Sequence, residues 1–252
     1  MPWVTKNSTE TYREESQQTQ YTNRQKAANW WDYHKWQVIL GVVGVAAAVW
    51  IVKDTVFRTR PDVEVGYVAH AELPVDTAEA LTEFLQSHCT DLNGDGKVVV
   101  QLNQYTIDFD AESESTDAYY QMAGVTRLSA DLGPGGKTYL FLMDDPEGFE
   151  EQTGALQYLD GTVPADPNTV PASEWPYMVY RWADCPVLAG ADLGTYRGLT
   201  VLDDQEGSSQ ELLAGLYVGR RGVWNPDQVE DFAGGPELWA ALTAGATPMQ
   251  VE

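Results

Sequence analysis

The residue pattern with the most specific chemistry lies at residues 91–97, with the sequence DLNGDGK. It matches the start of a calcium-binding loop, in which alternate side-chain oxygens and one backbone carbonyl surround a hard cation and a glycine permits the tight turn. The expected Ca²⁺ ligands are the side chains of Asp91, Asn93 and Asp95 and the backbone carbonyl of Lys97. Leu102 occupies the twelfth loop position, where helix–loop–helix calcium sites have a bidentate acid, so a distant carboxylate would have to complete the shell. The pattern predicts either a structural Ca²⁺ site or a turn held by Asx side chains.

Residue types used in covalent catalysis are few, and no known catalytic motif arranges them. The sequence contains neither a G-x-S-x-G nucleophile turn nor an H-E-x-x-H metal pair. His88 precedes Cys89 near the end of a predicted helix, where neighbouring side chains point about 100° apart and do not form a dyad. His70 ends a predicted strand, a position at which parallel sheets place ligand-binding groups, or else it is a plain surface residue. We therefore predict no catalytic residue and no cofactor other than Ca²⁺.

Carboxylates, aromatic rings and two cysteines are the other side chains that could form a site. The close acidic pairs are Asp108/Asp110, Glu112/Glu114, Asp144/Asp145, Glu150/Glu151 and Asp203/Asp204. Any of these pairs could serve a glycosidase, but none is distinguished from the others, so we interpret them as a solvated acidic surface. The aromatic residues near Pro176 are Trp175, Tyr177, Tyr180 and Trp182. These rings would anchor a loop or stack on a sugar or protein partner, while Cys89 and Cys185 leave a disulfide or two free thiols open.

An α/β domain over residues 63–252 must position these side chains. Alternating and β-branched apolar runs predict strands at 63–69, 97–102, 138–143, 199–202 and 216–218. Apolar residues at helical spacing predict helices at 74–89, 116–131 and 236–244. The order strand–helix–strand–helix–strand predicts a parallel or mixed sheet joined by right-handed crossovers. Four of the five prolines in residues 145–177, Pro164, Pro167, Pro171 and Pro176, interrupt this segment, which we expect to lack regular structure and to form a functional loop or lid.

Charge and hydrophobicity divide the chain into two parts. Residues 1–53 carry six basic and four acidic side chains and the remainder carries nine basic and 34 acidic ones, so the formal charges are +2 and −25. The acidity excludes nucleic acid as a partner, because phosphate binding needs clusters of Lys and Arg. Residues 38–52 are uniformly apolar, and a helix over residues 36–57 would cross a bilayer. The alternatives are a buried soluble helix, which would show an amphipathic period, and a cleaved signal peptide, which would have a shorter leader.

The remaining segments surround this predicted transmembrane helix. Residues 1–21 are polar and are expected to be a disordered cytoplasmic tail. Residues 22–35 are expected to form a juxtamembrane amphipathic helix capped by Thr22 or Asn23, and residues 58–62 a linker. The numbers of basic residues on the two sides of the span are equal and do not indicate an orientation. We therefore infer the orientation from the acidic C-terminal domain. We expect a single-pass protein of the cell membrane with a cytoplasmic N-terminus and an extracellular C-terminal domain.

The aromatic segment at residues 29–36 (NWWDYHKW), which leads directly into the span, carries a resemblance to a group of proteins. It resembles the N-terminus of uncharacterised single-pass surface proteins of Gram-positive bacteria, in which an N-W/Y-x-Y-x-K-W segment precedes the membrane helix and an extracytoplasmic α/β domain. The resemblance covers residues 22–145, including 91–100. The expected domain is also similar to one lobe of extracellular solute-binding proteins. Both resemblances imply fold and location and carry no catalytic motif.

These observations predict a membrane-anchored extracytoplasmic binding or interaction protein. Its expected partners are the lipid bilayer and a protein or small-molecule ligand. The alternatives are a surface-anchored hydrolase that uses carboxylates or a bound metal, and a structural subunit of an envelope complex. A convergent set of titratable groups at the carboxyl ends of the strands, beneath residues 145–177, would favour the hydrolase, and its absence would favour binding.

Overall fold

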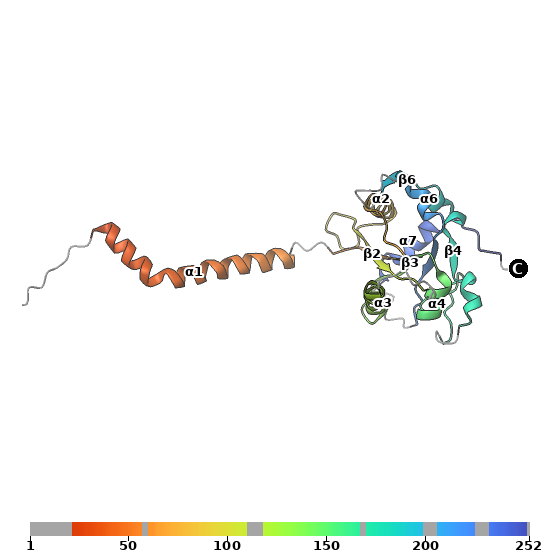
Figure 1. Cartoon of the computed structure of the whole chain (residues 1–252), viewed down its shortest axis with the longest axis horizontal. Coiled ribbons are helices and arrows are strands. Elements are labelled where there is room, and N and C mark those ends of the chain that lie inside the picture. The colour runs from red at the N-terminus through yellow and green to blue at the C-terminus, as the bar shows by residue number, and fades with distance from the viewer. Residues whose placement is uncertain are drawn as a thin grey trace, which may run out of the picture. The chain divides into compact units, whose positions relative to one another are not determined.

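The computed structural model describes residues 22–56, 60–109, 118–166, 170–198, 206–224 and 232–250. The chain forms two compact units, Met1–Arg58 and Thr59–Glu252, and each is described by itself (Figure 1). The predicted tail at 1–21 and the predicted strand at 199–202 lie outside the described residues. The same holds for five of the paired acids, Asp110, Glu112, Glu114, Asp203 and Asp204.

The first unit contains one long helix, α1 (Asn23–Val56). Thr22 begins it with a reciprocal cap, because the Gln25 N–H donates to Thr22 Oγ1 at 3.4 Å and the Thr22 N–H donates to Gln25 Oε1 at 3.0 Å. Residues 22–35 and 36–57, expected as a juxtamembrane helix that runs into a span, lie on this single helix as far as Val56. Among the described residues, only the stretch Asn23–Lys53 of α1 is long and apolar enough to cross a membrane, and none of it is buried within the chain. A membrane span and a signal sequence both have these properties.

The second unit is built on a mixed sheet with the strand order β2-β1-β3-β7-β4 (Figure 1). Its strands are β1 (Val63–Ala69), β2 (Val100–Thr106), β3 (Leu140–Met143), β4 (Val179–Arg181) and β7 (Tyr217–Arg220). β1 pairs in parallel with β2 and β3, whereas β7 runs antiparallel to β3 and β4. The first three strands thus form the expected parallel core, and β7 makes the sheet mixed. Beside it, β5 (Thr195–Arg197) and β6 (Glu206–Ser208) form a two-stranded antiparallel sheet.

Helices cover both faces of the five-stranded sheet (Figure 1). They are α2 (Val75–Gln86), α3 (Ala118–Leu132), α4 (Pro146–Thr153), α5 (Pro186–Ala189), α6 (Ser209–Leu213) and α7 (Gly235–Leu242), with 3-10 helices η2 (Ala172–Tyr177) and η3 (Trp182–Asp184). Successive residues of β1 point to opposite faces, so Val65 packs with Leu81 of α2 while Val68 packs with Leu128 of α3. The first cluster includes residues of α5, α6 and α7, and the second includes Phe149 of α4. Two hydrophobic layers therefore enclose the sheet.

Residues 145–177 contain more regular structure than the prolines predict. Asp145 caps α4 by accepting the Gly148 N–H at 3.0 Å, Pro146 occupies the first turn, and Gly154 ends the helix in the left-handed conformation with φ 55°. Each of these residues is a recognised helix boundary signal. The expectation of an irregular segment was therefore wrong for α4, because this helix precedes the four interrupting prolines and its own Pro146 lies in the first turn, where proline is tolerated.

Glu150 on α4 is a buried carboxyl group, only 3% exposed. The Leu156 N–H donates to its Oε2 at 3.0 Å, and its Oε1 has no hydrogen-bond partner among the described residues. Burial raises the pKa of Glu150 to about 7, and the hydrogen bond from Leu156 opposes this shift only in part. The carboxyl group is thus neutral in the folded protein below neutral pH.

Glu150→Gln is expected to stabilise the domain at pH 8 by about 2–3 kcal/mol and to change little at pH 5. The pKa is higher in the folded than in the unfolded chain, so the folded state binds more protons and wild-type stability falls as pH rises from about 4.5 to about 7. Glutamine keeps an acceptor for Leu156 and does not ionise. Urea unfolding of the detergent-solubilised protein at both pH values measures the difference. Glu151→Gln, at an exposed neighbour, is the control, and an equal effect of Glu150→Gln at both pH values would contradict the assignment.

Candidate functional site

The order of the parallel strands creates a topological switch point between β1 and β3. From β1 the chain passes through α2 to β2 on one side, and then through α3 to β3 on the other side of β1. α2 and α3 pack on opposite faces of the sheet. Connections that leave neighbouring strands toward opposite faces open a crevice at the carboxyl ends of those strands, where sheets of this kind bind ligands.

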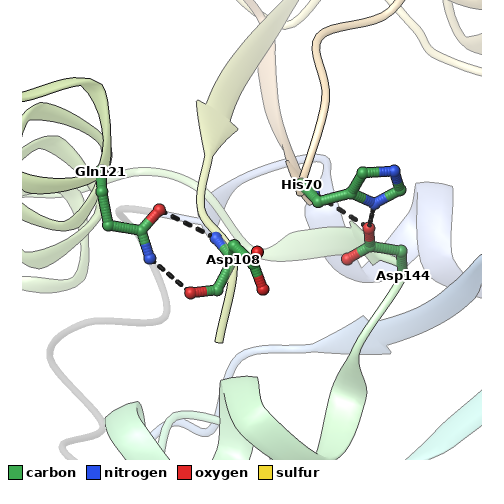
Figure 2. Close-up of polar contacts among 4 residues, drawn as sticks. All are labelled: His70, Asp108, Gln121 and Asp144. Carbon is green, nitrogen blue, oxygen red and sulfur yellow. Dashed lines mark hydrogen bonds and ion pairs between the residues drawn. The ribbon is translucent and has the colours of Figure 1, made fainter. Parts of the chain in front are cut away.

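His70 and Asp144 meet at this switch point (Figure 2). His70 follows β1 and Asp144 follows β3. The His70 backbone N–H donates to Asp144 Oδ2 at 2.9 Å, and His70 Nδ1 lies 2.5 Å from the same oxygen. Since the carboxylate accepts, Nδ1 carries a proton, which leaves Nε2 to accept from a ligand in the neutral ring or to donate in the charged ring. The imidazole is 74% exposed and the Asp144 side chain 24%, so a ligand can reach the pair.

Asp108 follows β2 at the same edge of the sheet, and Gln121 of α3 fixes its backbone. The Asp108 N–H donates to Gln121 Oε1 at 3.0 Å, and Gln121 Nε2 donates to the Asp108 carbonyl. Figure 2 shows the Asp108 carboxylate extending from the backbone on the side opposite Gln121. This two-point contact sets the direction in which the chain leaves β2. The second carboxylate thus has a defined place at the carboxyl edge.

Tyr67 adds a buried phenol beneath this edge. Burial, and then the nearby charge of Asp144, raise the pKa of Tyr67 well above its ordinary value, so its hydroxyl stays protonated. Within the described part of the chain, His70 has no serine, threonine or cysteine as a hydrogen-bond partner. An imidazole held by a carboxylate without a nucleophile is suited to binding polar or charged ligand groups.

The predicted calcium loop forms a turn whose side-chain oxygens accept its own backbone N–H groups. Asp91 accepts from Gly94 at 2.7 Å and Gly96 at 2.8 Å, Asn93 accepts from Asp95 at 2.9 Å, and Asp95 accepts from Lys97 at 2.9 Å. Gly94 and Gly96 have φ values of 72° and 83°, which only glycine adopts readily. No group of three or more His, Cys, Asp or Glu side chains placed to hold a metal occurs among the described residues. The Asx turn is therefore present, and the Ca²⁺ ion stays a prediction.

Asp62 attaches this loop to the start of β1, a role that the sequence did not reveal. Its Oδ1 accepts from the N–H groups of Leu92 at 2.9 Å and Asn93 at 3.2 Å, and its Oδ2 accepts from Val99 at 2.8 Å. Desolvation opposes ionisation of this carboxyl, but the backbone hydrogen bonds prevail and lower the pKa of Asp62 below its ordinary value. The same bonds explain why the strand predicted at 97–102 begins only at Val100, since residues 97–99 belong to the loop.

A cavity of about 560 Å³ lies beside the edge strand β4. Its walls include Tyr158, Asp160, Pro176, Tyr177, Tyr180 and Met249. Two of the four rings that were predicted to anchor a loop or bind a partner, Tyr177 and Tyr180, thus face a cavity. The other two have packing roles, because Trp175 lies edge-on to Tyr217 at 5.5 Å and Trp182 is only 1% exposed.

The two cysteines are free thiols, with Cys89 half-buried and Cys185 buried. Burial raises the pKa of Cys89 to about 11 and that of Cys185 to about 12, so neither is a thiolate at neutral pH. His88 packs against its own helix, with Nδ1 2.9 Å from the Phe84 carbonyl. None of these three residues contributes to the switch point.

Sequence reasoning placed His70 at a strand end but did not pair it with Asp144. The sequence did contain one indication of this pair. Asp144 directly follows the apolar strand predicted at 138–143, just as His70 directly follows the strand predicted at 63–69. Gln121 carried no such signal. No known protein family, no curated protein and no solved structure matches the chain. The function is therefore inferred from the geometry of the described residues.

Proposed function

We propose that the chain is a single-pass membrane protein that presents a ligand-binding α/β domain outside the cell, with its N-terminus in the cytoplasm. The observation that carries the binding function is the contact between His70 and Asp144 at the switch point of the sheet. A doubly wound sheet exposes ligand-binding groups at the carboxyl ends of the strands that flank its switch point, and these two residues directly follow β1 and β3. In this proposal the domain is related to one lobe of solute-binding proteins, and its ligand is a small polar or charged molecule.

Residues 91–97 enter the proposal as a structural Ca²⁺ loop next to the sheet. The support is the spacing of Asp91, Asn93 and Asp95 together with the tight turn that they form. Calorimetry and melting of the full protein in millimolar Ca²⁺ test this part. The absence of both binding heat and a shift in melting temperature would remove it.

A surface-anchored hydrolase is the second candidate, and the His70–Asp144 pair is the observation that favours it. An imidazole oriented by a carboxylate can act as a general base toward water, and Asp108 stands at the same edge. Binding remains the better supported function, because the described residues offer His70 no nucleophile and assemble no metal cluster. Turnover of a bound ligand by the wild-type protein, and its loss in His70→Gln, would favour the hydrolase instead.

His70→Gln and Asp144→Asn are each expected to weaken ligand binding at least tenfold, about 1.4 kcal/mol, because each removes one half of the charged hydrogen-bonding pair. A thermal-shift screen of the intact protein against amino acids, organic acids, sugars and amines would identify the ligand. A ligand at 100 times its Kd stabilises the folded state by about 2.7 kcal/mol, a readily measured shift. Binding in each variant then follows by calorimetry.

His88→Gln is the matched control for these substitutions, because the hydrogen bonds of His88 within the described part of the chain are to Ser87 and Phe84 of its own helix region. It should leave the affinity of any ligand found in the screen within about twofold of wild type. Ligands that bind His70→Gln and Asp144→Asn as tightly as wild type would refute a site at the switch point.

A further inference from the structure

The cavity beside β4 lies outside the switch point and has a different chemistry. Three tyrosine rings, Tyr158, Tyr177 and Tyr180, share its lining with Asp160, the one carboxylate that the described residues place there. We propose that this tyrosine pocket, formed by Tyr158, Tyr177 and Tyr180, binds an organic quaternary ammonium group, with Asp160 as its counter-charge. This second binding site goes beyond the proposed function and does not depend on it.

Hydrogen bonds and ring contacts hold the pocket walls in place before any ligand arrives. The Leu159 N–H donates to the Tyr177 carbonyl at 2.9 Å, which ties two walls of the pocket together. The Tyr158 hydroxyl donates to Glu174, and the Tyr180 ring packs against Trp239 with centroids 5.8 Å apart. Tyr177 remains 52% exposed at the entrance. Rings that are already fixed lose little conformational entropy on binding, so the pocket is preorganised.

The charge of the pocket favours a cation. Asp160 Oδ1 accepts from the Thr162 N–H at 2.8 Å and from its hydroxyl at 2.7 Å. These two hydrogen bonds lower the pKa of Asp160, so the carboxylate is ionised at neutral pH. Its Oδ2 has no partner among the described residues, and no Lys, Arg or His lines the cavity. The −25 formal charge of the chain beyond residue 53 further concentrates cations near its surface.

The charge of Arg220 acts on this carboxylate, but the Arg220 side chain is engaged elsewhere. Its Nη2 donates to the carbonyls of Tyr158 at 3.2 Å and Leu159 at 3.0 Å, and its guanidinium lies 4.9 Å from the centre of the Trp239 ring. These contacts attach its guanidinium to the backbone of two lining residues, Tyr158 and Leu159, so it supports the pocket wall. Arg220 therefore lowers the negative potential at Asp160 without occupying the pocket.

The lining distinguishes a quaternary ammonium group from other ligands. Aromatic faces carry a negative quadrupole that attracts a cation within about 6 Å, and a methylated nitrogen needs no hydrogen-bond acceptors of its own. A sugar would need several polar partners, whereas the polar side chains that line this cavity are one carboxylate and tyrosine hydroxyls. An anion would face Asp160 directly. A cavity of about 560 Å³ holds such a group together with a substituent.

The test is calorimetric titration of the full-length protein, in nanodiscs of phosphatidylglycerol that contain no choline, with choline and with 3,3-dimethylbutan-1-ol. The alcohol has the same shape, with carbon in place of the charged nitrogen. Choline is expected to bind at least tenfold more tightly, because only choline gains the cation–π and carboxylate contacts. No saturable binding up to tens of millimolar choline, or equal affinity for the alcohol, would overturn the proposal.

Variants at the exposed Tyr177 distinguish the contribution of its ring to choline binding from that of its hydroxyl. Tyr177→Leu should weaken choline binding at least fivefold, while Tyr177→Phe should keep it within about twofold because the ring remains. Asp160→Asn should also weaken choline at least fivefold without changing the affinity for the alcohol. Met122→Ala, at a side chain that is 71% exposed and outside the pocket lining, is the control. Unchanged choline binding in Tyr177→Leu would place the ligand elsewhere and overturn the proposal.

The ammonium group could belong to a free solute or to a lipid head group, and a change of bilayer distinguishes them. The choline titration is repeated in phosphatidylcholine nanodiscs. If the lipid competes with choline, the natural ligand of the pocket is a lipid head group. If the affinity for choline is unchanged in those nanodiscs, the natural ligand is a free solute. Both results support the tyrosine pocket as a site for quaternary ammonium.

Discussion

Replacement of Val45 and Val49 together by arginine is expected to release the protein from the membrane. Both residues lie near the middle of the apolar stretch of α1, with 65% and 61% of their surfaces exposed. An arginine at the centre of a bilayer raises the insertion free energy by about 2.5–3.5 kcal/mol, so two raise it by about 5–7 kcal/mol. After alkaline carbonate extraction, the wild-type chain should sediment with membranes and the double arginine variant should stay in the supernatant.

Apolar substitutions at the same two positions are the matched control, since Val45→Leu with Val49→Leu keeps the helix insertable and should leave the protein in the pellet. The intact mass of the membrane-bound chain separates a retained span from a cleaved signal sequence, because cleavage after α1 would remove the helix. Sedimentation of the arginine variant with membranes would show that α1 is not the anchor.

Protease added to intact cells tests the proposed orientation. This orientation predicts digestion of the C-terminal domain, so survival of the domain would reverse it.

Local sequence patterns were enough to predict the helices and strands whose formation depends on neighbouring residues. The strand at 63–69 is confirmed to the residue, because alternate side chains of β1 face the core formed with α2. The helix predicted at 74–89 ends earlier, at Gln86, where Ser87 and His88 turn their N–H groups back to carbonyls of the last turn. The helix predicted at 116–131 corresponds to α3, within two residues at each end. Periodicity was sufficient for α2 and α3 because each buries one side against the same sheet.

Elements that depend on distant partners could not be predicted in this way. Asp62 holds residues thirty or more positions away in the loop, so β2 begins only at Val100 and runs on to Thr106, and no local pattern in 97–102 contains that information. The strand at 216–218 corresponds to β7 (Tyr217–Arg220), but its partners are β3 and β4, a pairing that only the whole sheet defines. The same limitation applies to the candidate site. His70 was placed at a strand end, yet its contact with Asp144 follows from the strand order β2-β1-β3, which is a long-range property.

Arg221→Met is expected to destabilise the domain by about 3 kcal/mol, the largest effect of a single substitution outside α1. Arg221 follows β7 and is only 6% exposed. Its Nη1 donates to the Asp131 carbonyl at 3.0 Å and its Nη2 to the Leu132 carbonyl at 2.5 Å, so it satisfies the last carbonyls of α3, which have no partner within the helix. The guanidinium also lies 5.1 Å from the centre of the Phe232 ring. Methionine matches its length but leaves those carbonyls without a donor.

Unfolding of the detergent-solubilised protein, followed by tryptophan fluorescence, measures this loss as a fall of roughly 6–12 °C in Tm. Arg221→Lys keeps the charge but presents one ammonium where the guanidinium donates from two nitrogens, so it should recover less than half of the stability. Arg181→Met on β4 removes an exposed arginine of the same sheet and should change the free energy of unfolding by less than about 0.5 kcal/mol. If Arg221→Met and Arg181→Met had equal effects, capping of α3 would contribute nothing, and the attachment of α3 to β7 would have to rest on apolar packing alone. A larger loss in Arg221→Met shows instead that one basic side chain, in a domain with few of them, joins the parallel half of the sheet to its antiparallel half.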